Sequence, residues 1–166
     1  YTTAYCSEYI VTQVSDINSG SGSSNAGGYM SILVGDRIYF DADDGTDGRE
    51  LWVHDTSTGT TWQDSDINIG SNSSSPGKYM EILVGDTIYF DADDGTDGRE
   101  LWAKNLKNGS RWQVFDLHLS GSSFPGTNME ILVGDTIYFD ATTLFGGTEL
   151  WAHDTSNHST WLVANI

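Results

Sequence analysis

The stretch that decides the fold is residues 85–102, which read GDTIYFDADDGTDGRELW. Residues 35–52 repeat it with a single difference, Arg37 in place of Thr87. Residues 134–151 carry a more divergent copy, GDTIYFDATTLFGGTELW. Self-similarity at a fixed period of about 50 residues is the signature of solenoids, propellers and other repeat arrays. We therefore divide one domain into an N-terminal segment, residues 1–13, followed by repeats at residues 14–63, 64–113 and 114–166.

Each repeat is predicted to form four β-strands. In the second repeat, Gly85-Asp86 indicates a tight hairpin turn and Asn108-Gly109 indicates another. The segments between these turns are rich in β-branched and aromatic residues, which favour strands. We expect the strands at Met80–Val84, Thr87–Ala92, Glu100–Lys104 and Arg111–Phe115. No segment has the periodicity of an amphipathic helix, so the sequence predicts an all-β protein.

Two of these strands are apolar in succession rather than in alternation, at Ile82-Leu83-Val84 and Ile88-Tyr89-Phe90. Continuous apolar runs indicate burial on both faces, as in a propeller blade between two neighbours. We therefore predict a β-propeller built from three four-stranded blades per chain. A β-trefoil monomer, which also has twelve strands in three repeats, is the alternative. In the propeller, tryptophans of the third and fourth strands would fill the spaces between blades: Trp52, Trp62, Trp102, Trp112, Trp151 and Trp161.

Three blades are too few to close a ring, because propellers typically have about four to eight. An incomplete ring would leave open edges that promote aggregation. A homodimer that shares one ring of about six blades removes those edges, so we expect an oligomer, with a dimer favoured. The pattern of the fourth strand supports joining of chains, since it occurs once more than there are repeats. Its copies lie at Thr12–Ile17, Trp62–Ile67, Trp112–Leu117 and Trp161–Ile166, and the surplus copy could complete a blade across a subunit joint.

The core motif resembles a known family. Residues 44–52 and 94–102 both read DGTDGRELW and are similar to the ELWxxDGT repeat proteins. The resemblance covers nearly all of residues 14–166, but residues 53–57, VHDTS, lack the Asp-Gly-Thr that follows the tryptophan in the family. The resemblance implies a propeller-like architecture and an extracellular location, because members of the family are secreted or surface-anchored. It implies little about activity.

An acidic loop between the second and third strands is a candidate metal site. It clusters carboxylates around flexible glycines, and Ca²⁺ takes six to eight such hard oxygen ligands. The candidate ligands are Asp41, Asp43, Asp44 and Asp47 in the first repeat and Asp91, Asp93, Asp94 and Asp97 in the second. Turn chemistry is the alternative, since Asp and Gly also favour tight turns. Thr142 and Thr143 replace aspartates in the third copy, where calcium binding is expected to be weak or absent.

Polar and aromatic residues recur together at the end of this loop. Their side chains could hold a pair of sugar hydroxyls beside an indole ring, and repetition would add avidity through multivalency. The candidate ligand-binding residues are Arg49, Glu50 and Trp52, with Arg99, Glu100 and Trp102 in the second copy. A salt bridge that pins the loop to the strand is the alternative interpretation.

Composition narrows the class of function. The chain has a formal net charge of −17, so nucleic acid and anionic membranes are poor partners. No apolar run reaches the roughly 18 residues of a membrane span. The sequence lacks a nucleophile elbow, a phosphate-binding loop and zinc-ligand spacing. Cys6 is the only cysteine, and the chain begins at Tyr1, which fits a mature secreted protein or a fragment.

Two hypotheses remain at this stage. The first is a secreted, non-enzymatic, multivalent binding protein that recognises carbohydrate or glycoconjugates through its repeated loops, as a lectin does. The second is a structural or surface-assembly protein whose repeats are stabilised by calcium.

Overall fold

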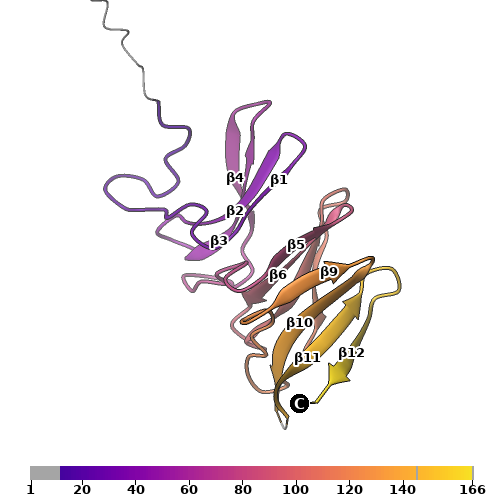
Figure 1. The fold of residues 1–166 in the computed structure, drawn as a ribbon. Helices are drawn as coiled ribbons and strands as arrows, with labels where there is room; N and C mark the ends of the chain where they lie inside the picture. Colours follow the sequence, from indigo (N-terminus) through magenta and orange to yellow (C-terminus); the bar gives the residue numbers. More distant parts are fainter. Residues whose placement is uncertain (1–11, 145, 166) are drawn as a thin grey trace, which may run out of the picture.

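The computed structural model of this chain describes residues 12–144 and 146–165. In this part of the chain, twelve strands form three separate four-stranded sheets (Figure 1). The first sheet contains β1 (Ser31–Val34), β2 (Arg37–Asp43), β3 (Arg49–Asp55) and β4 (Thr60–Ser65). The second contains β5 (Glu81–Val84), β6 (Thr87–Asp93), β7 (Arg99–Asn105) and β8 (Arg111–Phe115). The third contains β9 (Glu130–Val133), β10 (Thr136–Thr143), β11 (Gly147–Asp154) and β12 (Ser159–Ala164).

Each sheet is an antiparallel meander in which consecutive strands are neighbours. In the first sheet, Phe40 of β2 lies opposite Trp52 of β3, and Tyr39 lies opposite Val53. Because side chains alternate along a strand, Phe40 and Trp52 share one face and Tyr39 and Val53 share the other. Both faces are therefore apolar, as the continuous apolar runs predicted.

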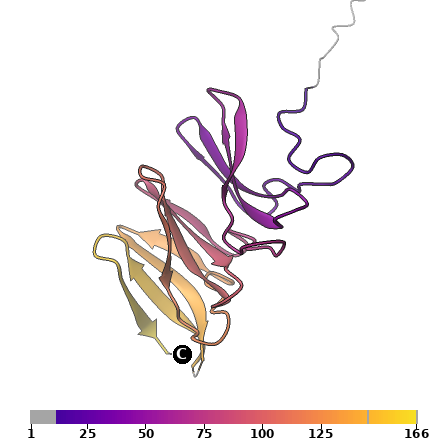
Figure 2. The ribbon, with the colours of Figure 1, turned by 180° about the vertical axis from the view of Figure 1, so that it is seen from behind.

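The strands predicted for the second repeat are confirmed to within one residue at each end. The three sheets follow one another side by side in chain order, in the manner of propeller blades (Figures 1 and 2). The β-trefoil alternative is not observed, because every strand in the described residues pairs only within its own repeat. The reason is local: short turns join strands that are adjacent in sequence, and antiparallel pairing follows at once.

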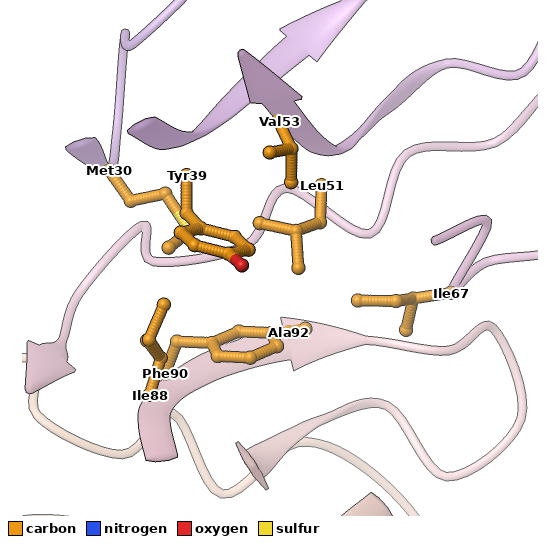
Figure 3. Packing of buried hydrophobic residues seen from close by; sticks show 8 residues of the cluster. All are labelled: Met30, Tyr39, Leu51, Val53, Ile67, Ile88, Phe90 and Ala92. Carbon is orange, nitrogen blue, oxygen red and sulfur yellow. The ribbon is translucent and has the colours of Figure 1, made fainter. Parts of the chain in front are cut away.

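A hydrophobic core fills the junction between the first and second sheets (Figure 3). The first sheet contributes Tyr39, Leu51 and Val53, and Ile88 and Phe90 of β6 face them from the second sheet. The fully buried residues of the junction are completed by Met30, Ile67 and Ala92. An equivalent core between the second and third sheets contains Met80, Tyr89, Leu101, Ala103, Leu117, Ile137, Phe139 and Ala141. The sheets are thus held together by side-chain packing, not by strand pairing.

A methionine of one repeat packs on a glycine of the next at both junctions. A Cβ atom added at Gly126 would lie 2.5 Å from the Cβ of Met80, far inside van der Waals contact. Gly77 meets Met30 in the same way at the first junction. Only glycine leaves room for the methionine at these two positions, so each junction has a fixed knob and a fixed hole.

The N-terminal part of the described chain differs from the prediction. The structure has no strand at Thr12–Ile17, although the same pattern forms β4, β8 and β12. Those three strands pair with β3, β7 and β11 of their own repeats, whereas no third strand of the described residues pairs with the surplus copy, which precedes the first sheet. Cys6 and most of segment 1–13 lie outside the described residues, as does Phe145. In residues 12–144 and 146–165 no helix is long and apolar enough to cross a membrane.

Candidate functional site

A buried aspartate fixes the chain at the entrance to each sheet. Oδ1 of Asp41 accepts hydrogen bonds from the backbone N–H groups of Tyr29 (2.8 Å) and Met30 (2.9 Å). Asp91 holds Tyr79 and Met80 in the same way at 2.8 and 3.0 Å. Asp140 repeats the arrangement with Asn128 and Met129 at 2.9 and 3.0 Å. The carboxylate therefore positions the methionine before each sheet, and in the first two repeats this methionine fills a junction.

In the first two repeats an arginine neutralises this aspartate. The guanidinium of Arg99 donates to Asp91 Oδ2 at 2.5 Å and to the backbone oxygens of Ser74 (2.9 Å) and Ser75 (3.0 Å). Its Cζ atom lies 5.7 Å from the centre of the Tyr79 ring. Arg49 makes the corresponding ion pair with Asp41 and stacks near Tyr29. Both aspartate side chains are fully buried, so removal of either partner would leave an uncompensated charge.

The glutamate that follows the arginine links its sheet to the next linker. Glu100 accepts hydrogen bonds from the backbone of Leu117 (3.1 Å) and Ser123 (2.8 Å) and from the Ser123 hydroxyl (2.5 Å). Burial raises the pKa of Glu100 to about 7, despite the hydrogen bonds that favour its charged form. Glu50 makes the same three contacts with Ile67 and Ser74, and burial raises its pKa as well.

The residues that the sequence proposed as sugar ligands therefore lie inside the network. Glu50 and Glu100 are buried, Arg99 is buried and Arg49 is largely so. Trp102 is half-buried against the core of the first junction, and Trp151 occupies the same place in the second. Trp52 is half-buried on β3. Both arginines form salt bridges with an aspartate of the preceding strand, and both glutamates accept hydrogen bonds from the following linker. A salt bridge was the alternative interpretation of this motif, although the sequence did not identify the aspartate as the partner.

The remaining aspartates of the acidic loop form turns. Asp43 accepts a hydrogen bond from Gly45 N (2.7 Å), and Asp44 accepts from Thr46 N (2.8 Å) and Asp47 N (2.9 Å). Asp93, Asp94 and Asp97 repeat this geometry in the second copy. Although burial opposes ionisation, these hydrogen bonds lower the pKa of Asp44 and Asp94. No group of three or more acidic, His or Cys side chains in the described residues is arranged to hold a metal ion. Asp41 and Asp91 therefore have a different role from the other aspartates: they hold the segment that precedes each sheet, whereas the others form turns.

The third repeat lacks the arginine and has an open pocket in its place. Thr148 occupies the arginine position, and its hydroxyl lies 2.8 Å from that of Thr142. The side-chain amide of Asn128 donates to Asp140 Oδ2 at 2.6 Å. The pocket has a volume of about 280 Å³ and is lined by Tyr79, Phe124, Thr127, Asn128, Asp140, Thr142 and Thr148. Sequence reasoning identified the third loop as altered but missed this pocket. The exchange of Arg99 for Thr148 was the available signal.

One face of the third sheet is also uncovered. Met129 is 38% exposed, whereas the equivalent Met80 is 1% exposed. Ile131 and Val133 on β9 are 52% and 58% exposed, although their counterparts Ile82 and Val84 pack into the second junction. This set of Met129, Ile131 and Val133 is called the knob face below.

The opposite end of the chain presents the complementary surface. Ile38 and Phe40 on the first sheet correspond to Ile88 and Phe90, which the first junction buries completely. An apolar pocket of about 380 Å³ opens here, lined by Val14, Ala26, Gly27, Ile38, Phe40, His54 and Thr56. Gly27 is the counterpart of Gly77, and a Cβ atom added to it would meet only atoms at 3.9 Å. This pocket is called the hole face below.

Comparisons with known proteins bear on the fold. No protein-family model matches the sequence, and no curated protein is significantly similar to it. Among solved structures, the chain is similar to TolB from Acinetobacter baumannii, with a TM-score of 0.51 and 15% sequence identity. The match covers 79% of this chain and 30% of that TolB chain, so this chain spans less than a third of the TolB structure.

At this identity the likeness to TolB concerns architecture alone. It agrees with three antiparallel four-stranded sheets arranged like propeller blades. The resemblance to the ELWxxDGT repeat proteins rests on the sequence motif and stays a prediction.

Proposed function

We propose that this chain is a secreted, non-enzymatic assembly protein that completes a β-propeller by associating with a second copy of itself. The observation that carries the proposal is the pair of open faces at the two ends of the array. The knob face exposes Met129, Ile131 and Val133, whose counterparts pack into the second junction. The hole face exposes Gly27, whose counterpart Gly77 is buried at the first junction. The two internal junctions therefore show how faces of this kind are covered when two sheets pack together.

The occupant of each face follows from those internal junctions. Met30 fills the hole at Gly77, and Met80 fills the hole at Gly126. Within residues 12–144 and 146–165, no glycine hole receives Met129 and no methionine fills the hole at Gly27. A second copy of this chain offers the matching half of both contacts. Burial of each large apolar side chain contributes about 1.5–3 kcal/mol, so several such residues per joint give a substantial driving force.

The size of the assembly follows from ring closure. A knob-to-hole contact between different faces is heterologous, and such contacts give closed rings or open filaments. Propellers close with about four to eight blades. Two copies of the three sheets described here give six blades, which falls within that range. Two equivalent joints then bury all four end faces.

Light scattering coupled to size-exclusion chromatography tests the proposal directly. The expected mass is twice the 18.1 kDa of one chain and independent of concentration above the dissociation constant. A monomer at micromolar concentration would contradict the proposal. Polymers of indefinite length would favour an open filament over the closed ring.

Carbohydrate recognition by the repeated loops is a second candidate role, supported by the repetition of the loops and by the multivalency that a ring would add. Because Arg49, Glu50 and their counterparts are engaged internally, a sugar would contact the outer turn residues instead. A glycan array tests this role: binding that is lost when residues 44–47 and 94–97 are exchanged for neutral turn sequences would support it. An array without bound glycans would exclude it.

A further inference from the structure

We propose that the open pocket of the third repeat binds a guanidinium group carried by a small molecule or by an arginine of a peptide. This site lies between the second and third repeats of one chain. It does not use either end face, so it is independent of ring closure.

The first step of the argument is that the other repeats hold a guanidinium in this place. Arg99 is surrounded by the Asp91 carboxylate, the carbonyl oxygens of Ser74 and Ser75, and the ring of Tyr79. The planar, five-donor guanidinium matches this arrangement of acceptors in a way that an ammonium or a hydroxyl does not. Arg49 occupies the same position in the first repeat.

The second step is that the third repeat retains the backbone frame of this site, although Asn128 stands at the position that Tyr79 has in the second repeat. Thr142 N donates to Ser123 O at 2.7 Å, just as Asp93 N donates to Ser74 O at 3.0 Å. Gly126 N donates to Asp140 O at 2.8 Å, and Gly77 N donates to Asp91 O at the same distance. Asp140 Oδ1 accepts from the backbone N–H groups of Asn128 and Met129, just as Asp91 Oδ1 accepts from those of Tyr79 and Met80. The carboxylates of Asp140 and Asp91 therefore lie in equivalent places relative to the backbone.

The third step is that, among the residues that the structure describes, no cation forms a salt bridge with Asp140. Asp140 is 8% exposed, and its side-chain partners are the neutral groups of Asn128 and the backbone. Replacement of the arginine by Thr148 leaves an open pocket of about 280 Å³ beside it. Charge-assisted, bidentate hydrogen bonds to a carboxylate are roughly twice as strong as neutral ones.

Two further features favour a cationic ligand. The rings of Tyr79 and Phe124 line the pocket in an edge-to-face arrangement, with centroids 6.1 Å apart. Aromatic rings attract a guanidinium through cation–π interactions. The net charge of −17 on the chain also raises the local concentration of cations and speeds their association.

A matched pair of ligands tests the chemistry. N-acetyl-arginine amide and N-acetyl-citrulline amide have nearly the same shape, but only the first carries a charge. Each compound is titrated into the ¹⁵N-labelled protein. The arginine compound should change the amide chemical shifts of Asn128, Thr142 and Thr148. We expect the citrulline compound to bind at least about ten-fold more weakly, equivalent to about 1.4 kcal/mol. Equal affinity for both compounds, or shift changes elsewhere, would overturn the proposal.

A single substitution tests the location. Thr148→Arg should restore the ion pair with Asp140, raise the melting temperature and weaken binding of the arginine compound at least about ten-fold. The control Ser71→Arg adds the same charge at an exposed residue that does not line the pocket and should leave binding within about two-fold. Undiminished binding by Thr148→Arg would overturn the assignment. So would displacement of the arginine compound by a neutral monosaccharide. If Thr148→Arg does not fold, the shift map of the unmodified protein decides the question.

Discussion

The side chain of Met80 lies so close to Gly126 that a Cβ atom at position 126 would be 2.5 Å from the Cβ of Met80. The backbone of Gly126 also has a φ of +78°, which costs a residue with a side chain about 1–2 kcal/mol. We expect Gly126→Ala to lose that amount plus about 1–3 kcal/mol from overpacking of the junction. Urea unfolding followed by tryptophan fluorescence measures the sum.

The matched control for this substitution is Gly134→Ala in the same repeat. Gly134 has a φ of +60°, and a Cβ atom added to it would meet nothing within 4 Å. Its cost should therefore be the backbone strain alone, about 1–2 kcal/mol. Equal destabilisation by the two substitutions would show that the contact of Met80 with Gly126 does not exclude a side chain at position 126.

The end faces can be tested by charge. Ala26→Glu places a carboxylate in the hole face and Val133→Glu places one on the knob face, and both positions are exposed in the single chain. Burial of an unpaired charge is unfavourable, so each variant should be a folded monomer in light scattering. Ser71→Glu, an exposed substitution outside both faces, should leave the dimer intact.

Mixing the two variants tests the head-to-tail geometry. One joint of the mixed dimer would contain both substitutions, and the other would contain neither. We expect the mixture to form a dimer with one native joint, with a dissociation constant higher than that of the unmodified protein. If the mixture stays monomeric while Ser71→Glu dimerises, the knob and hole faces do not contact each other.

Much of this fold could be predicted from the sequence because its determinants are local. The turns at Gly85-Asp86 and Asn108-Gly109 and the apolar runs between them fix strands that pair with their neighbours in the chain. The surplus segment Thr12–Ile17 shows the limit of such reasoning. Its pattern matches that of β4, yet a strand also needs an edge to pair with, and the pattern does not reveal whether one is present.

The candidate site was less predictable because the partners of its charged groups are distant in sequence. Glu50 belongs to a motif that suggested a ligand contact, but its hydrogen-bond donors Ile67 and Ser74 lie on the following linker. The pocket beside Thr148 likewise depends on Tyr79 of the preceding repeat. A short sequence motif does not show which distant residues will contact it, because these contacts arise only when the sheets pack together.

The link formed by Glu100 makes a prediction about pH. The pKa of Glu100 is about 7 in the folded chain and about 4.5 in the unfolded chain. Between pH 4.5 and pH 7, the Glu100 carboxyl is therefore protonated more in the folded state than in the unfolded state. The contribution of Glu100 to the free energy of unfolding should therefore be greatest below pH 4.5. It should fall by at most about 3 kcal/mol as the pH rises to 7. Glu100→Gln should remove this decline, as seen in urea midpoints measured from pH 4.5 to 8.

The difference between Glu100→Gln and the unmodified protein is the informative quantity. Burial lowers the pKa of His153 to about 4, and that group acts in the opposite sense: its contribution is present above pH 6.5 and lost toward pH 4. The unmodified protein and Glu100→Gln both retain His153, so the effect of His153 cancels in the difference between their free energies of unfolding. Asp36→Asn, which removes one exposed charge, should run parallel to the unmodified protein. A difference curve without slope between pH 4.5 and 7 would contradict the role of Glu100.

The acidic loops give a prediction about calcium. Asp44 Oδ1 closes its turn by accepting from Thr46 and Asp47, and a neutral asparagine offers the same acceptor. We expect Asp44→Asn to melt within about two degrees of the unmodified protein and Asp44→Ala to lose about 0.5–1.5 kcal/mol. A chelator should leave the midpoint of the unmodified protein unchanged. A rise of several degrees with millimolar Ca²⁺, absent with Mg²⁺ at equal ionic strength and absent in Asp44→Asn, would instead establish the loop as a calcium site.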